Sequence, residues 1–200
     1  MESVLISARP KWCWKICHEI GKDENSKPIY EKRIEVRKTA PKKVPFKAYI
    51  YCSYGNDKEN YMLGSRGKVI GEFICDEVDE YKLHEGLTKF NPMGFPSKIY
   101  AYLIFPDDYK AMCLSYKDVK TYGKGKTLYG WHISDLKIYD KPKELSEFKT
   151  PPCDKPEKAC EKCKYLYEVD CFEENGREIS RPPQSWQYVE ELENGCRKSI

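Results

Sequence analysis

Two oppositely charged side chains share one face of a predicted strand that reads Lys32-Arg-Ile-Glu-Val-Arg37. Side chains two residues apart in a strand lie on the same face, so Glu35 and Arg37 point one way while Ile34 and Val36 point into a core. Lys32 is out of phase with the pair and joins it only if the strand begins just after it. A carboxylate beside a guanidinium can offer an acceptor and a forked donor to a base edge or a phosphate. Alternation alone fits equally well a half-buried edge strand with a solvated outer face.

A second chemical pattern lies near the C-terminus, where cysteines are spaced as Cys153-x6-Cys160-x2-Cys163-x7-Cys171. The central C-x-x-C pair lets two thiolates reach one ion, and the outer cysteines complete a tetrahedral set. The segment has almost no aliphatic side chains, so an ion would have to organise it. A structural zinc ion is our first interpretation. An iron–sulfur cluster fits the same ligands, and free thiols or disulfides are the remaining alternatives.

Other polar or aromatic residues give weaker signals. His132 lies in an aromatic segment and is more often a satisfied core residue than a catalyst, while His18 and His84 are expected on the polar surface. Trp12 follows Pro10 in sequence and is placed to offer a stacking face if the site holds a base. The loop from Gly123 to Lys126 lacks the length and the Ser/Thr of a phosphate-binding P-loop. We interpret it as a basic turn that could contact a phosphate group of a ligand.

Composition limits the function classes. Thirty-five Lys and Arg against 32 Asp and Glu leave a net charge of +3, which is too small for charge alone to imply nucleic acid. An apolar content of 40% over 200 residues allows a real core and fits one domain with an appendage. The apolar runs are far shorter than a membrane span, and the start lacks a signal peptide's basic residues. A soluble, cytoplasmic protein with reduced thiols is therefore expected.

Periodicity predicts more short strands than helices. The predicted strands cover residues 4–8, 32–38, 46–52 and 68–75, one or two strands within 128–139, and an edge strand at 187–190. Helices are predicted over residues 10–20 and 115–122, the second because Ser115 and Asp118 form a capping box. Gly71 marks a bulge or a close backbone approach, and residues 99–105 fit either a strand or an apolar run in a lid. Since no βαβ unit repeats, an α+β fold based on a small mixed β-barrel is expected.

With these elements in this order, the chain resembles the ASCH domains of the PUA-like superfamily. Those domains begin with an apolar strand that ends in a small or polar residue and Pro, here Ser7-Ala-Arg-Pro10. A helix and a signature usually written G-x-K-x-x-E-x-R follow. Here Lys32, Glu35 and Arg37 match the charged positions, and the segment 71–76 resembles the next family strand. The resemblance extends from residue 1 to residue 140.

The resemblance implies a cleft, lined by the signature strand, that recognises RNA or a modified base. Lys32, Glu35 and Arg37 are the binding residues that it implies, and we further expect Arg9 near the phosphates and Trp12 as a stacking face. One departure is that Tyr30 occupies the position of the signature glycine, with a long connection over residues 21–31, so a remodelled entrance to the pocket is expected. Some ASCH proteins are amidohydrolases of acetylated cytidine with a Thr where this chain has Glu35, and that side chain lacks the hydroxyl nucleophile for a covalent mechanism.

The sequence therefore predicts a protein that binds nucleic acid or nucleotides, either as a regulator or as a reader of a modified base. One alternative is a hydrolase of a modified nucleoside such as an acylated cytidine, with Lys32 as base, Glu35 or Glu72 as acid and water as nucleophile. Another is a protein-interaction module whose cleft is vestigial. The expected division is a barrel over 1–145, a cysteine-rich metal-binding appendage over 146–180, and a C-terminal strand and tail over 181–200.

Overall fold

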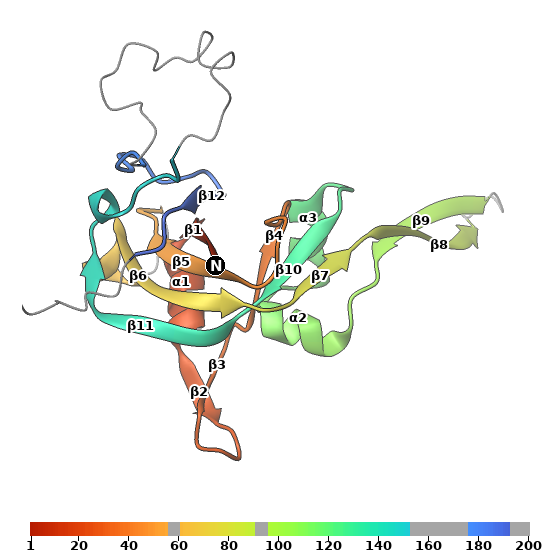
Figure 1. The fold of residues 1–200 in the computed structure, drawn as a ribbon. Coiled ribbons are helices and arrows are strands. Elements are labelled where there is room, and N and C mark those ends of the chain that lie inside the picture. Colours follow the sequence, from red (N-terminus) through yellow and green to blue (C-terminus); the bar gives the residue numbers. More distant parts are fainter. Residues whose placement is uncertain (56–60, 91–95, 153–175, 193–200) are drawn as a thin grey trace, which may run out of the picture. The chain divides into compact units, whose positions relative to one another are not determined.

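A computed structural model describes residues 1–55, 61–90, 96–152 and 176–192 (Figure 1). Strands with a few short helices make up the described part, which confirms the predicted α+β class. The chain divides into two compact units, each built from segments that are distant in sequence. The first unit comprises Met1–Lys11, Phe46–Phe73 and Lys137–Ile200, and the second comprises Trp12–Pro45 and Ile74–Leu136. No helix in the described ranges is long and apolar enough to cross a membrane.

A five-stranded mixed sheet, with the order β11-β6-β5-β1-β12, dominates the first unit. Its strands are β1 (Glu2–Ala8), β5 (Phe46–Cys52), β6 (Lys68–Cys75), β11 (Ser134–Lys143) and β12 (Trp186–Val189). β1 pairs in parallel with β5 and antiparallel with β12, which confirms the predicted C-terminal edge strand. The described strands leave the sheet open at β11 and β12, so the expected closed barrel is not formed by them.

Sequences rich in apolar and aromatic residues explain why β1 and β5 are buried strands of this sheet. Val4, Leu5 and Ile6 are fully buried, and every residue of β5 is buried, as expected of strands that are covered on both faces. Leu5 and Tyr49 pack in one apolar cluster with Phe148, the residue directly after the 3-10 helix Leu145–Glu147. A Cβ on Gly71 would lie 2.5 Å from the carbonyl oxygen of Lys137, so the predicted close backbone approach is confirmed.

The second unit contains a three-stranded antiparallel sheet with the order β4-β10-β7 (Figure 1). Its strands are β4 (Ile34–Arg37), β10 (Leu128–His132) and β7 (Val78–Tyr81). The other elements are α1 (Pro10–Cys17), β2 (Glu19–Lys22), β3 (Pro28–Tyr30), β8 (Leu83–Phe90), β9 (Pro96–Tyr102), α2 (Pro106–Met112) and α3 (Tyr116–Gly123). β10 is the central strand of this sheet, because it pairs with β4 on one side and with β7 on the other.

Apolar side chains from one face of this sheet form the core of the second unit. Ile34 and Val36 of β4 pack in one cluster with Tyr81, Met112 and Val119. The capping box predicted for α3 is present, since Asp118 N donates to Ser115 Oγ and Ser115 N donates to Asp118 Oδ2. Residues 99–105, for which the sequence allowed either a strand or an apolar run in a lid, belong to the strand β9 as far as Tyr102.

The first helix is shorter than predicted. It ends at Cys17 instead of continuing to Ile20, because Glu19–Lys22 pair with Pro28–Tyr30 as a hairpin. Asp23 stabilises the turn of this hairpin by accepting hydrogen bonds from the backbone of Asn25 and Lys27, each at 2.8 Å. The polar connection expected between the helix and the signature is therefore an ordered turn.

Candidate functional site

The backbone just before β4 brings Lys32 into the charged cluster. Lys32 N donates to Lys15 O at 3.0 Å, and Arg33 N donates to Ala111 O at 2.8 Å, so these residues bond outside the strand. β4 begins at Ile34, so Lys32 lies before the strand and is not bound by its alternation of faces. Lys32 can therefore join Glu35 and Arg37, as expected for a strand that starts after it. The position of the strand start therefore places three charges together.

These three side chains, which we call the charged cluster, are buried and paired with one another. Lys32 is 2% exposed, Glu35 7% and Arg37 6%, which excludes the solvated outer face that alternation alone allowed. Arg37 Nη2 lies 2.9 Å from Glu35 Oε1, and Lys32 Nζ lies 3.4 Å from Glu35 Oε2. Lys32 Nζ also donates to the carbonyl oxygens of Ile34 and Met112, each at 2.8 Å. The carboxylate thus lies between two cationic groups.

Burial makes the electrostatics of the cluster unusual. Desolvation lowers the pKa of Lys32, and the nearby Glu35 carboxylate opposes that effect. Among the described residues, Oε2 of Glu35 accepts no hydrogen bond and has only its ion pair with Lys32. The cluster thus combines one buried carboxylate with two buried cationic side chains, and polar groups of this kind are costly to enclose unless each finds a partner.

Partly exposed aromatic rings adjoin the charged cluster. Lys32 Nζ lies 5.2 Å from the centroid of the Trp12 ring on α1. Directly paired residues on neighbouring strands point to the same face, so Tyr129 on β10 lies beside Arg37. Tyr122 on α3 is 38% exposed. Burial raises the pKa of its hydroxyl, and the nearby charge of Arg37 counteracts part of that rise. These rings offer flat apolar surfaces next to buried polar groups.

Three other residues with a role predicted from the sequence make no described contact with the charged cluster. Arg9 is exposed and belongs to the first unit, so its role in binding stays a prediction. Glu72, the alternative acid, also belongs to the first unit, where it accepts a 2.5 Å hydrogen bond from Tyr139 Oη. Lys124 caps the C-terminus of α3 with a left-handed backbone and is exposed, as expected for a basic turn.

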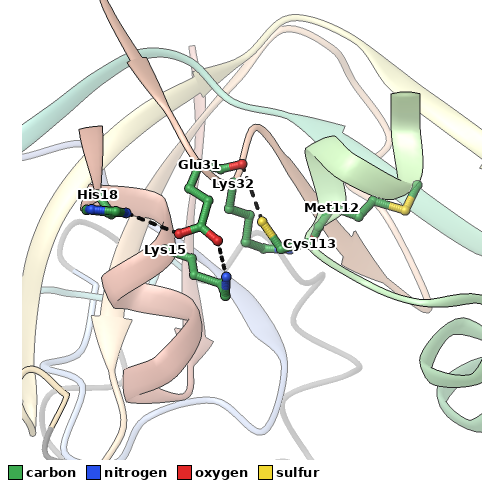
Figure 2. Close-up of polar contacts among 6 residues, drawn as sticks. All are labelled: Lys15, His18, Glu31, Lys32, Met112 and Cys113. Carbon is green, nitrogen blue, oxygen red and sulfur yellow. Dashed lines mark hydrogen bonds and ion pairs between the residues drawn. The ribbon is translucent and has the colours of Figure 1, made fainter. Parts of the chain in front are cut away.

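A polar network that the sequence did not predict connects α1 to the segment before β4. Figure 2 shows the Glu31 carboxylate between Lys15 and His18. Its Oε2 lies 3.2 Å from His18 Nδ1, and the Glu31 carbonyl oxygen accepts from Cys113 Sγ at 3.3 Å. The hydrogen bond from Lys15 lowers the pKa of Glu31. Lys15 and His18 carry no local signal of a partner thirteen or more residues away, so only the fold reveals the network.

His132 differs in part from its predicted role as a satisfied core residue. Its imidazole has a partner, because Nε2 lies 2.7 Å from Asp79 Oδ2, but the side chain is 31% exposed rather than enclosed. His18 is exposed, as predicted. The predicted metal ligands Cys153, Cys160, Cys163 and Cys171 lie outside the described residues, and their zinc or iron–sulfur site stays a prediction.

Comparison with known proteins gives matches in structure only. No protein-family model matches the sequence, and no curated protein matches it. The fold is similar to the crystal structure of ASCH from Zymomonas mobilis, with 14% identity, a TM-score of 0.48, and coverage of 94% of this chain and 88% of that one. A Tyr-to-Phe mutant of that protein has 13% identity, a TM-score of 0.49 and coverage of 96% and 92%. A Ser-to-Ala mutant has 12% identity, a TM-score of 0.49 and coverage of 94% and 89%.

Proposed function

We propose that the charged cluster recognises a nucleotide base, either in single-stranded RNA or in a modified nucleoside. The observation that carries this proposal is a buried and mutually paired Lys–Glu–Arg set that is bordered by partly exposed aromatic rings. The resemblance of the signature to that of ASCH domains supports the same class of ligand. The proposal rests on the chemistry of this chain's own residues.

The polar groups of the cluster suit a base edge. Glu35 is an acceptor-only group when ionised, while Arg37 offers donors in a fixed fork. Sequence-specific recognition of RNA relies on splayed bases that hydrogen-bond to such groups and stack on aromatic rings. Stacking contributes about 1–3 kcal/mol per base, so Trp12, Tyr122 and Tyr129 would supply much of the affinity.

Lys32 has a different task within this site. Two backbone carbonyls hold its ammonium group, so the side chain has little freedom to reach a ligand directly. It lies against the carboxylate of Glu35 and orients it.

The test is binding of single-stranded oligonucleotides and modified nucleosides to folded variants over a salt titration. Glu35→Gln is expected to change the preference among bases, because the amide also donates. Arg37→Ala should weaken binding to every ligand by about 1–3 kcal/mol, the usual scale for a lost bidentate contact. Arg33→Ala removes a neighbouring exposed arginine and serves as the charge-matched control. If Glu35→Gln and Arg37→Ala, both verified as folded, bind the panel as the parent does, the charged cluster is an internal ion pair only.

One observation favours a hydrolase as a second candidate. Burial lowers the pKa of Lys32, and a neutral amine can act as a general base. Glu35 has no hydroxyl, so water would have to be the nucleophile and no acyl-enzyme would form. Chromatography of acetylated cytidine after incubation with the parent and with Lys32→Met tests this candidate. Turnover by the parent that Lys32→Met lacks would support it, and a trapped acyl adduct on the protein would contradict the proposed mechanism.

A further inference from the structure

We propose that Glu77, Asp79 and His132 form a binding site for a divalent transition-metal ion. One ligand atom from each residue lies within 4.8 Å of the ligand atoms of the other two. Glu77 lies just before β7, Asp79 lies on β7 and His132 ends β10. Two carboxylates and an imidazole from adjacent antiparallel strands thus converge at one place.

Backbone hydrogen bonds hold this donor set on a rigid support. His132 N donates to the carbonyl oxygen of Glu77 at 3.0 Å, which fixes the two ends of the site to each other. Asp79 pairs directly with Gly130, two residues before His132 on β10. Ligands on paired strands keep their geometry better than ligands on loops, as a metal site requires.

An outer hydrogen bond orients the Asp79 carboxylate. Tyr81 Oη donates to Asp79 Oδ2 at 2.9 Å. A Cβ on Gly130 would lie 2.7 Å from the Tyr81 ring and 2.9 Å from its hydroxyl oxygen, so the glycine leaves the space that this tyrosine needs. Partners of this kind fix the direction of a ligating group and typically affect metal affinity by about 10–100-fold.

The surroundings of the three ligands have an excess of negative charge. The ion pairs that the described residues make to Glu77 and Asp79 come only from His132, at 4.0 and 2.7 Å. The Asp108 carboxylate also lies close enough to interact electrostatically with Asp79. A divalent cation would compensate these carboxylates and would take the place of the contact between His132 Nε2 and Asp79 Oδ2.

The donor types select the class of ion. Imidazole suits zinc, iron and nickel, and carboxylates suit manganese, so a mixed set of one nitrogen and two oxygen donors fits a first-row divalent ion. Three protein ligands leave further coordination positions for water. Thiolates prefer zinc and iron clusters, so manganese separates this site from the cysteines near the C-terminus.

The strand register separates this site from the charged cluster. Successive side chains along a strand point to opposite faces of the sheet. His132 and Asp79 therefore lie on the face opposite Trp131 and Glu35. Loss of the metal site therefore need not affect binding of a nucleotide base. The two proposals can fail independently of each other.

The test is a titration of the full chain with MnCl₂, in which the electron paramagnetic resonance signal of free Mn²⁺ reports binding. The parent is expected to bind one equivalent, and Asp79→Asn and His132→Gln should bind at least about tenfold more weakly. Glu80→Gln is the matched control, because Glu80 neighbours Asp79 on β7 and pairs with Lys82 at 2.8 Å instead. Its affinity should equal that of the parent.

Nuclear magnetic resonance locates the ion in the same samples. Bound Mn²⁺ should broaden the signals of His132 and its neighbours, and Cys160→Ser together with Cys163→Ser should leave this effect intact. The proposal is overturned if the parent binds no Mn²⁺ at millimolar concentration, or if folded Asp79→Asn binds it as tightly as the parent does. Loss of binding in the double cysteine variant would also overturn it, because the ion would then belong to the C-terminal cysteines.

Discussion

At the scale of single residues, burial decides the character of the charged cluster. The alternation of the signature strand predicted which side chains share a face, and the start of β4 at Ile34 brings Lys32 to them. The sequence did not predict that all three are enclosed, because enclosure depends on distant partners. One such partner is the carbonyl oxygen of Met112, 80 residues from Lys32 along the chain.

The depressed pKa of Lys32 leads to a prediction about stability. Its ordinary pKa is 10.5, and burial lowers it in the folded state, so between the two values the unfolded chain binds more protons. The free energy of unfolding of the parent should therefore rise with pH through this window, relative to that of Lys32→Met, and the rise should end near pH 10.5. Urea unfolding of both proteins over a pH series measures the difference, in which the titration of other groups cancels. Parallel curves for the two proteins would show that Lys32 stays charged in the fold.

At the scale of elements, Glu31 connects α1 to the segment that enters β4. Its carboxylate contacts Lys15 on the helix and His18 just after it, while the next residue, Lys32, belongs to the charged cluster (Figure 2). The network therefore helps to fix where β4 begins. The register of β4 in turn decides which side chains reach the cluster.

Glu31→Gln should destabilise the protein in a pH-dependent way. The hydrogen bond from Lys15 lowers the pKa of Glu31 from its ordinary 4.5, so its contribution is present above that pH and is lost as pH falls through the folded value. For a partly exposed pair we expect a loss of about 0.5–1 kcal/mol at neutral pH. Urea unfolding at neutral pH and below pH 4.5 measures it, with the exposed Glu24→Gln in the hairpin turn as control. An equal loss at both pH values would mean that the carboxylate charge is not the cause.

Elements with a local cause were predictable. The capping box of Ser115 and Asp118 fixes the start of α3, the apolar run of β1 predicts a buried strand, and the aromatic and β-branched residues of β5 predict a strand. The end of α1 was not predictable from helical spacing, because Ile20 is 55% exposed and lies in a strand of the hairpin instead of packing on a core. The contact between Asp79 and His132 joins residues 53 apart, so strand pairing creates it and no local motif does.

At the scale of the whole molecule, the charged cluster belongs to one of the two compact units. Lys32, Glu35 and Arg37 lie in the second unit, as do the aromatic rings beside them. Each unit is discontinuous in sequence, so spacing along the chain could not predict this grouping. The predicted boundaries near residues 145 and 180 stay a prediction, since most of the cysteine-rich segment lies outside the described residues.

The cysteine-rich segment gives a prediction for the complete chain. We propose that Cys153, Cys160, Cys163 and Cys171 bind a structural zinc ion, or an iron–sulfur cluster on the same ligands. Elemental analysis of aerobically and anaerobically purified protein should find close to full occupancy of one of these metals. Cys160→Ser combined with Cys163→Ser should remove it, whereas Cys17→Ser should not. Less than about 0.2 equivalents of both zinc and iron per parent chain would contradict the site, because structural sites are normally filled.

The central claim is that the charged cluster and its aromatic rim bind a nucleotide base. Photocrosslinking of single-stranded RNA that contains 4-thiouridine, followed by mass spectrometry of the crosslinked peptides, tests the location of binding most directly. We expect crosslinks to the peptides that carry Trp12, Tyr122 or Tyr129, and we expect them to be lost in Arg37→Ala but retained in Arg33→Ala. Bound RNA that crosslinks only to the segment 153–175, or crosslinks that Arg37→Ala leaves unchanged, would contradict the claim.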